Sequence, residues 1–284
     1  MALKRLVTPK PADVGMPVQR LLPRMGQRSV GPFVFLDHFG PIVPPPGKGD
    51  VLAHPHIGLA TVTYLFSGEM LHKDSLGTVQ PIVAGELNWM SAGRGIVHAE
   101  RLPDAVRARG EAMHGLQLWV ALPQAHEEGE PGFWHHPASA LPTAEGEGLA
   151  ARVMVGAAFG QRSPVITPMQ TLYVSVELAA GASLQVPQWG AERAVYAVEG
   201  ALEVDGTPVP PQHLAVLEPG ESVVRASAAA KLVVLGGEPL DAPRHMWWNF
   251  VHSDPKRIGA AKQAWKDDAF PRVPGETVRI PAPE

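Results

Sequence analysis

The sequence predicts an all-β protein that consists of two similar antiparallel β-barrels followed by a short C-terminal helix. Its 284 residues include 29 glycines and 30 prolines but only 18% charged residues, which is typical of many turns and short strands. The apolar fraction of 45% is sufficient to fill two cores. Short runs of β-branched and aromatic residues recur between the turns, and part of this pattern is repeated in the second half of the chain.

Strands in the first half are predicted by apolar and β-branched runs that end at glycine or proline. These runs cover residues 30–41, 59–66, 85–90 and 114–122. The polar residues 72–77 are expected to form a loop.

Four candidate metal ligands lie between these strands. His54 and His56 are separated by one residue, and so are His98 and Glu100. In an extended strand, side chains two residues apart point to the same side, so two facing strands would form one site with four ligands. Three imidazoles and one carboxylate suit a divalent first-row transition metal, and suit Mg or Ca poorly. An open coordination position would make the site chemical rather than structural.

The second half of the chain repeats the frame of the first but not these ligands. Residues 186–190 align with 54–58 without a gap, and 217–220 align with 90–93 when a shorter hairpin is allowed. The residues at the four ligand positions are then Val186, Gln188, Arg225 and Ser227. The sequence therefore predicts an N-terminal metal-binding barrel and a C-terminal barrel without metal ligands.

The boundary between the two barrels is expected in the Glu-, Pro-, Ala- and Gly-rich segment 131–148. We assign residues 1–135 to the N-terminal barrel and 136–284 to the C-terminal one. A helix is expected near residues 254–268, because Asp254 is a good N-cap and Pro255 suits the first turn. One face of this helix carries Ile258, Ala261 and Trp265.

Composition excludes several classes of protein. The net charge of −4 and the lack of a long basic run argue against direct nucleic-acid binding. The chain has no cysteine, which rules out thiolate ligands, disulfides and a cysteine nucleophile. No apolar run is long enough to span a membrane and no signal segment follows Met1, so we expect a soluble cytoplasmic protein.

The combination of motifs around the candidate ligands resembles the pirin family of the cupin superfamily. The resemblance rests on residues 54–56, 71–77, 93–100 and 114–120, and extends to Gly-Gly-Glu-Pro-Leu at 236–240. It implies a bicupin, in which each barrel is a double-stranded β-helix and the N-terminal one binds iron. By motif, the ligands would be His54, His56, His98 and Glu100.

The resemblance also implies an activity, because several pirins are quercetin 2,3-dioxygenases. On this hypothesis the cofactor is one divalent transition metal, expected to be Fe(II), with Mn, Ni, Cu, Co or Zn also suited to the donors. The substrates are a flavonol and O2, and the heterocyclic ring opens with loss of carbon monoxide. Glu100 is the predicted catalytic residue, acting as ligand and as general base for the flavonol hydroxyl.

Two other functions are consistent with the sequence. The first is a metal-containing regulatory or redox-sensing protein that acts through a protein partner, as described for other pirins. The second is a sugar epimerase or isomerase, whose chemistry does not need a redox metal. One departure from the family pattern is that Ile57 and Ala60 replace a basic and an acidic residue, which suggests a lost ion pair and an altered pocket mouth.

The remaining histidines receive other interpretations. His114 is either a residue that orients a ligand imidazole or an ordinary strand residue. His135 and His136 are expected in a solvated turn. A structural role is expected for His38, His72, His126, His213, His245 and His252.

Overall fold

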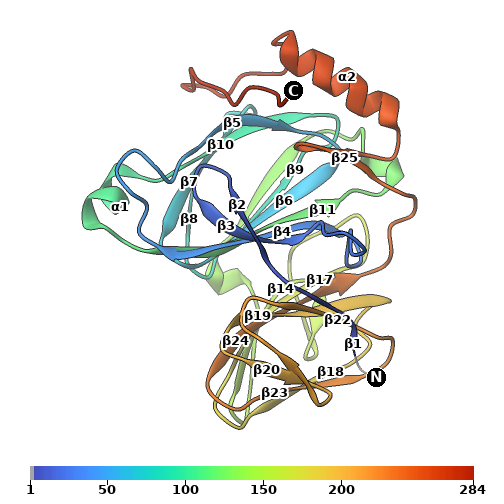
Figure 1. The fold of residues 1–284 in the computed structure, drawn as a ribbon. Helices are drawn as coiled ribbons and strands as arrows, with labels where there is room; N and C mark the ends of the chain where they lie inside the picture. The colour runs from blue at the N-terminus through green and yellow to red at the C-terminus, as the bar shows by residue number, and fades with distance from the viewer. Residues whose placement is uncertain (1–2) are drawn as a thin grey trace. The chain divides into compact units, whose positions relative to one another are not determined.

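The computed structural model describes residues 3–284, which form two compact units (Figure 1). We call them the N-barrel and the C-barrel. The N-barrel consists of residues 12–18, 37–138 and 240–284. Of the described residues, the C-barrel consists of 3–11, 19–36 and 139–239. The predicted fold class is confirmed: both units are antiparallel β-structures, and a short helix lies near the C-terminus.

The elements from the start of the chain to β12 are β1 Leu3–Val7, β2 Lys10–Asp13, β3 Pro17–Leu22, β4 Phe33–Ile42, β5 Val51–His56, β6 Leu59–Ser67, β7 Glu69–Asp74, β8 Val79–Val83, β9 Leu87–Ser91, β10 Ile96–Arg101, α1 Asp104–Arg109, β11 Met113–Ala121, the 3-10 turn η1 Gln124–His126 and β12 Gly132–His136. The elements that follow are η2 Ala138–Ala140, β13 Thr143–Gly146, β14 Leu149–Val155, β15 Ala157–Ala158, β16 Gln161–Arg162, β17 Thr171–Leu178, β18 Ser183–Val186, β19 Glu192–Glu199, β20 Leu202–Val204, β21 Thr207–Val209, β22 Leu214–Leu217, β23 Ser222–Ala226, β24 Ala230–Gly237, β25 His245–Trp247, β26 Phe250–His252 and α2 Pro255–Lys266.

The main strands form two seven-stranded and two four-stranded sheets. One pair has the orders β12-β9-β6-β11-β4-β3-β2 and β5-β10-β7-β8, and the other has β1-β22-β19-β24-β17-β14-β13 and β18-β23-β20-β21. The four strands predicted in the first half correspond to β4, β6, β9 and β11. The prediction of a loop at 72–77 is wrong for residues 72–74, which belong to β7. Every second side chain of this strand is buried, so the strand forms despite its polar composition.

Segment 131–148, expected to be a crossing connection, contains β12 and β13. β12 pairs with β9 along its whole length, so His135 and His136 lie on a strand and not in a solvated turn. The segment was expected to be a loop because Glu, Pro, Ala and Gly are common in loops. β12 nevertheless forms because it lies at the edge of the sheet, where pairing with β9 alone is enough.

The main core cluster of the C-barrel is apolar. It is built from valine, leucine and alanine side chains of its two sheets, including Val186 and Val224. Arg225 is exposed and pairs with Ser183, so its alignment with His98 is wrong, although the two barrels have the same kind of fold. The buried positions of β23 belong to Ser222, Val224 and Ala226, and none of them is a histidine or a carboxylate.

The two barrels are not contiguous in sequence. β1, at the start of the chain, pairs with β22 of the C-barrel. Residues 240–284, at the end of the chain, belong to the N-barrel. This division differs from the predicted one, which cut the chain once at 135/136 and placed each end with its neighbours in sequence.

The C-terminal segment covers the outer side of β5 and β10 (Figure 1). Helix α2 begins after Asp254, whose side chain accepts a hydrogen bond from the backbone N–H of Lys256, as its sequence predicts. The predicted apolar face is confirmed, since its three residues pack into one cluster with the outward residues of β5 and β10. That cluster contains Ala53, Ile57, Val97, Ala99, Phe250, Ile258, Ala261, Trp265 and Val273.

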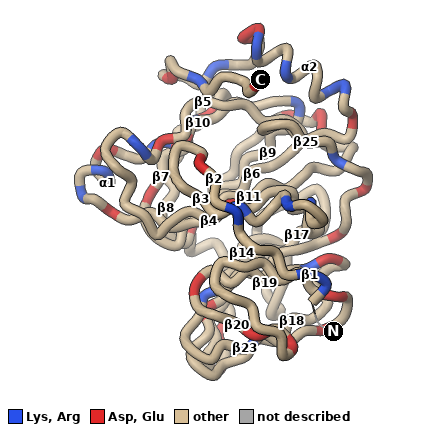
Figure 2. The backbone as a smooth tube through the Cα atoms, viewed as in Figure 1, with Lys and Arg blue, Asp and Glu red and all other residues tan. Residues whose placement is uncertain are grey.

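Basic and acidic residues are interspersed along most of the described backbone, whereas the charged residues within α2 are all basic (Figure 2). Among the described helices, none has the length and hydrophobicity needed to cross a bilayer.

Candidate metal centre

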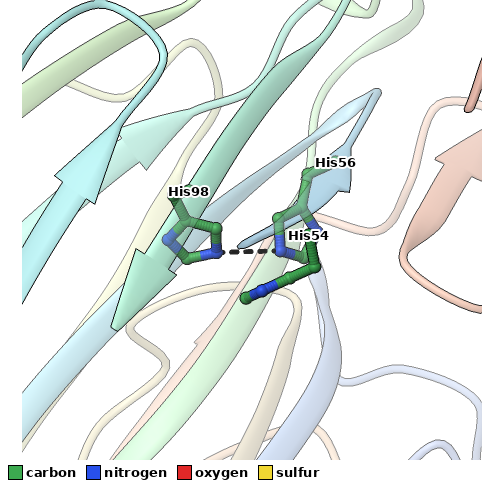
Figure 3. A group of neighbouring side chains, drawn as sticks. All are labelled: His54, His56 and His98. Atoms are coloured by element: carbon green, nitrogen blue, oxygen red, sulfur yellow. Dashed lines mark hydrogen bonds between the residues drawn. The ribbon is translucent and has the colours of Figure 1, made fainter. Parts of the chain in front are cut away.

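Three histidines converge inside the N-barrel. β5 carries His54 and His56, and its antiparallel neighbour β10 carries His98 directly opposite His54. Their ligand atoms all lie within 4.8 Å of one another, and Figure 3 shows the three rings grouped together between the two strands. The exposed fractions of the three residues are 6%, 1% and 1%, so the cluster is almost closed to bulk water.

The hydrogen bonds of His54 and His56 determine which nitrogen of each ring is available to a metal. The Nδ1 of His54 donates to the carbonyl oxygen of Leu52 at 2.8 Å, and the Nδ1 of His56 donates to that of Asn249 at 3.1 Å. Since a neutral imidazole carries one N–H, the Nε2 atoms of both rings keep their lone pairs. This is the usual arrangement of metal-binding histidines, whose second nitrogen is held by an acceptor.

A cation fits this arrangement better than a proton does. The Nε2 atoms of His56 and His98 lie 3.1 Å apart. A hydrogen bond between them would require one Nε2 to carry a proton, and a ring that already donates from Nδ1 would then be a buried imidazolium. Two nitrogens about 2.1 Å from one ion, at right angles to each other, are about 3 Å apart, which matches the observed separation.

Burial keeps the three imidazoles neutral. It lowers the pKa of His54 to about 4, although the hydrogen bond to Leu52 acts in the opposite direction. It also lowers the pKa of His56 and His98 well below the ordinary value, and the neighbouring histidines add to the effect. The lone pairs needed for metal binding are therefore available at neutral pH.

Glu100 follows His98 on the same face of β10. β10 pairs regularly with β7, but β5 contains an irregularity, so Glu100 lies opposite Val51. Among the described residues, Glu100 is not part of the group within 4.8 Å and has no hydrogen-bonding or ion-pairing partner. Burial raises the pKa of this carboxyl to about 7. Its role as fourth ligand stays a prediction, but a buried carboxylate without a described partner, two residues after His98 on the same strand, has the donor chemistry that a metal would satisfy.

Two polar residues that the sequence analysis did not assign to the site lie next to it: Asp74, and His72, for which only a structural role was expected. The Nε2 of His72 lies 3.0 Å from Oδ2 of Asp74, and the Nδ1 of His72 lies 3.5 Å from the Nδ1 of His98. Burial alone would raise the pKa of Asp74, but hydrogen bonds from His72 and Thr78 outweigh it and hold that pKa below its ordinary value. The signal in the sequence was the histidine and aspartate two residues apart, in a segment interpreted as a loop.

His114 has a different neighbourhood. Its Nε2 lies 2.7 Å from the Nε2 of His38, and the two rings are stacked with centroids 4.9 Å apart. Phe66 contacts the same ring. The predicted role of His114 in orienting a ligand stays a prediction.

Aromatic side chains of the seven-stranded sheet reach the histidines. Trp119 of β11 lies edge-on to His56 with ring centroids 5.2 Å apart, and Phe133 of β12 stacks on His72 at 4.3 Å. By contrast, Ile57 is fully buried in the cluster beneath α2. Its apolar side chain therefore suits a packing position, and the predicted effect of a lost charge on a pocket mouth is wrong for this residue.

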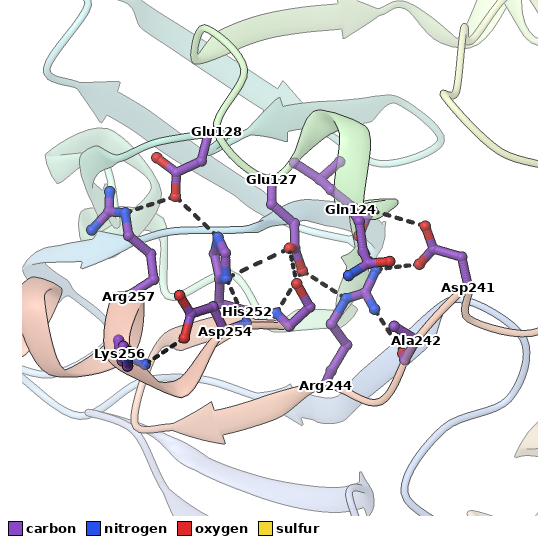
Figure 4. Close-up of polar contacts among 12 residues, drawn as sticks. Gln124, Glu127, Glu128, Asp241, Ala242, Arg244, His252, Asp254, Lys256 and Arg257 are labelled. Carbon is purple, nitrogen blue, oxygen red and sulfur yellow. Dashed lines mark hydrogen bonds and ion pairs between the residues drawn. The ribbon is translucent and has the colours of Figure 1, made fainter.

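The C-terminal segment is fastened beside the site by buried polar contacts (Figure 4). Arg244 forms an ion pair with Glu127 at 2.8 Å, and the side chains of both residues are no more than 3% exposed. Glu127 also accepts hydrogen bonds from the backbone N–H and the hydroxyl of Ser253. The Nε2 of His252 donates to Glu128 at 3.0 Å. These contacts hold the residues on both sides of Asn249, whose carbonyl supports His56.

The chain is similar to known proteins over nearly its whole length. The family model described as Pirin matches residues 15–120, and the one described as Pirin C-terminal cupin domain matches residues 173–271. A pirin-like protein of Caulobacter vibrioides is 47% identical over 256 residues, which are 88% of each chain. Pirin of Homo sapiens is 33% identical over 258 residues, 87% of this chain and 86% of that protein. The crystal structure of a quercetin 2,3-dioxygenase from Acinetobacter baumannii has a TM-score of 0.92 and 33% identity, and the match covers 99% of this chain and 95% of that one.

Proposed function

Because this chain belongs to the pirin family, we propose that it is a metal-dependent dioxygenase that opens the heterocyclic ring of flavonols such as quercetin. The observation that carries the proposal is the convergence of three buried imidazoles, whose ligand atoms lie within 4.8 Å of one another and of which His56 and His98 have their Nε2 atoms 3.1 Å apart. The similarity to a quercetin 2,3-dioxygenase of Acinetobacter baumannii supports the choice of substrate.

His54, His56 and His98 would hold the metal, with Glu100 as the fourth donor. We propose Fe(II), while Mn, Ni, Cu, Co and Zn suit the same donors, and nickel(II) is the ion named for a bacterial pirin of Escherichia coli. When bound, the metal supplies positive charge for a deprotonated flavonol hydroxyl and a redox centre for O2.

Glu100 is the proposed general base. Its carboxylate is buried two residues after His98 on β10 and no described residue competes for its oxygens, so we propose that it accepts the proton of the flavonol 3-hydroxyl. Three neutral imidazoles would not neutralise a divalent ion, so the site would stay positively charged and favour the deprotonated flavonol oxygen.

The sheet opposite the ligands offers surfaces for a flat polyphenol. Trp119 and Phe133 present aromatic rings beside His56 and His72. One step further along the same strands, on the same face, are Gln117 and His135, and the latter is hydrogen-bonded to Asn88 at 2.8 Å. We place the hydroxyl groups of the substrate near these polar side chains.

The test starts with protein purified without a tag, whose metal content is measured by elemental analysis. Loss of the flavonol absorbance is then followed under air and under nitrogen. We expect turnover only under air, and its abolition in His98→Ala and Glu100→Gln. His213→Ala, a change in the C-barrel, is the matched control and should retain activity.

The outcomes separate this proposal from the other functions. A metal-loaded wild type that does not consume flavonol under air would remove the substrate assignment and leave the metal centre in place. A stoichiometric partner sensitive to the oxidation state of the metal would then favour a regulatory protein. Activity on sugars that survives replacement of iron by zinc would favour an isomerase.

A further inference from the structure

His98 differs from the other two histidines in what supports it. The Nδ1 atoms of His54 and His56 face backbone carbonyl oxygens, whereas the Nδ1 of His98 faces the imidazole of His72, which in turn contacts the carboxylate of Asp74. β7 places both residues on one face, since they are two positions apart, and pairs Asp74 with His98 across the sheet.

Asp74, His72 and His98 form a series of hydrogen bonds, and the contacts of Asp74 determine which group donates at each step. The Oδ1 of Asp74 accepts from the backbone N–H groups of Leu76 at 2.9 Å and Thr78 at 3.0 Å. A carboxylate that accepts on one oxygen accepts on the other as well, so the Nε2 of His72 donates to Oδ2. The Nδ1 of His72 is therefore an acceptor, the Nδ1 of His98 is the donor, and the Nε2 of His98 keeps its lone pair.

Packing holds the series in place. Asp74 is fully buried and His72 is 6% exposed. The ring of His72 lies against Phe133 with an interplanar angle of 22°. The hydrogen bond from His72 to the carboxylate of Asp74 is buried and charge-assisted, so it is stronger than one to a neutral carbonyl. It polarises the imidazole of His72, which makes His72 a better acceptor for the N–H of His98.

We propose that Asp74 and His72 are positioning residues that set the tautomer of His98 and make it a stronger donor to the metal than His54 or His56. This inference rests on the metal centre proposed above. No proton is transferred, because the effect is the polarisation of two N–H bonds towards the carboxylate. A more electron-rich ligand stabilises the oxidised ion more than the reduced one, so the pair lowers the reduction potential of the site.

Asp74→Asn is the sharpest test, because it keeps the shape and inverts the hydrogen bonds. The amide oxygen can still accept from Leu76 and Thr78, but the NH2 group then faces His72 and turns its Nε2 into an acceptor. The Nδ1 of His72 becomes a donor, and the proton of His98 must move to Nε2, where it competes with the metal. His72→Phe keeps the stack on Phe133 and removes the link without inverting it.

The measurements are metal affinity, by competition with a chromophoric chelator, and the reduction potential of the iron-loaded protein. Affinity should fall about 10- to 100-fold in Asp74→Asn and less in His72→Phe. A tenfold preferential loss of Fe(III) over Fe(II) binding corresponds to a rise of about 59 mV in potential. Asp205→Asn, where a carboxylate of the C-barrel accepts from the backbone N–H of Val223, is the matched control and should change neither quantity.

The possible failures are distinct. If Asp74→Asn and His72→Phe melt at lower temperature but bind iron with the affinity and potential of the wild type, the two residues only stabilise the fold and this inference is wrong. If the wild type binds no transition metal at all, the proposed metal centre itself is wrong.

Discussion

The Nδ1 of His56 donates to the carbonyl oxygen of Asn249, a residue 193 positions later in the chain, at 3.1 Å. The same stretch of the C-terminal segment follows β5 closely, since the N–H of Val251 bonds to the carbonyl of Ile57 at 3.2 Å. A candidate metal ligand is thus oriented by the far end of the sequence. The stability of the C-terminal segment and the affinity for metal are therefore expected to be coupled.

Removing Arg244 tests this coupling. In Arg244→Met, Glu127 keeps a buried charge without its ion-pair partner, which is expected to cost about 3–5 kcal/mol in the free energy of unfolding. Metal affinity should fall as well, because the residues around Asn249 lose an anchor. The measurements are chemical denaturation and metal titration. Adding Glu127→Gln to this variant should restore part of the stability.

The control for that experiment is Arg225→Met. Arg225 forms an exposed pair with Glu203 at 3.9 Å, so its removal should change stability by about 0–1 kcal/mol. Equal losses in Arg244→Met and Arg225→Met would contradict the importance of the buried pair.

Gly58→Ala should weaken the contact between the end of β5 and the C-terminal segment at Val251. Gly58 has a φ of +66°, and a Cβ there would lie 1.9 Å from the carbonyl oxygen of Val251. The left-handed backbone costs about 1–2 kcal/mol for a residue with a Cβ, and the clash adds to it. Gly77→Ala, with a φ of +89° and no atom within 4 Å of its Cβ, carries the strain alone. Thermal melting should show a larger loss for Gly58→Ala, and similar losses would mean that the strand and the C-terminal segment separate freely.

The stability of the metal-free protein should depend on pH through His38. Burial, assisted by the nearby His114, lowers the pKa of His38 to about 3. Below pH 6.5 the unfolded chain therefore binds a proton that the folded protein excludes. The contribution of neutral His38 is fully present above pH 6.5 and is lost as pH falls towards 3, by about 1.4 kcal/mol per pH unit.

Urea denaturation between pH 7 and 5 measures this effect. The His38→Gln variant should lose about 2 kcal/mol less than the wild type between pH 6.5 and 5. If the free energy of unfolding changed with pH equally in the two proteins, His38 would take up its proton in the folded state at no cost in stability, which would contradict this prediction. The metal ligands titrate in both proteins, so the difference reports the contribution of His38 and its contact with His114.

Removing the metal should destabilise the protein. An ion that binds only the folded state adds about 4.1 kcal/mol to the free energy of unfolding at a free concentration 1,000 times its dissociation constant. Treatment with a chelator should therefore lower the melting temperature, and added metal should restore it. His54→Ala should melt at one temperature with or without metal, whereas His213→Ala should respond as the wild type does.

Local patterns in the sequence determined much of this protein. The run of β-branched and aromatic residues within 59–66 predicted β6, and the cap at Asp254 with three apolar residues on one face predicted α2. The spacing of His54, His56 and His98 predicted that these side chains would converge, because the two-residue period of a strand fixes the side to which each points.

The tertiary structure decided what depends on pairing between distant strands. The register of β10 against β5 and β7 places Glu100 beside His72 and opposite Val51. The position of the chain ends decides that Asn249 supports His56, and the registers in the C-barrel put Arg225 on the surface. Periodicity specifies the face of a strand but not its partner, since backbone hydrogen bonds are chemically alike at every register and only the packing of the whole core selects one.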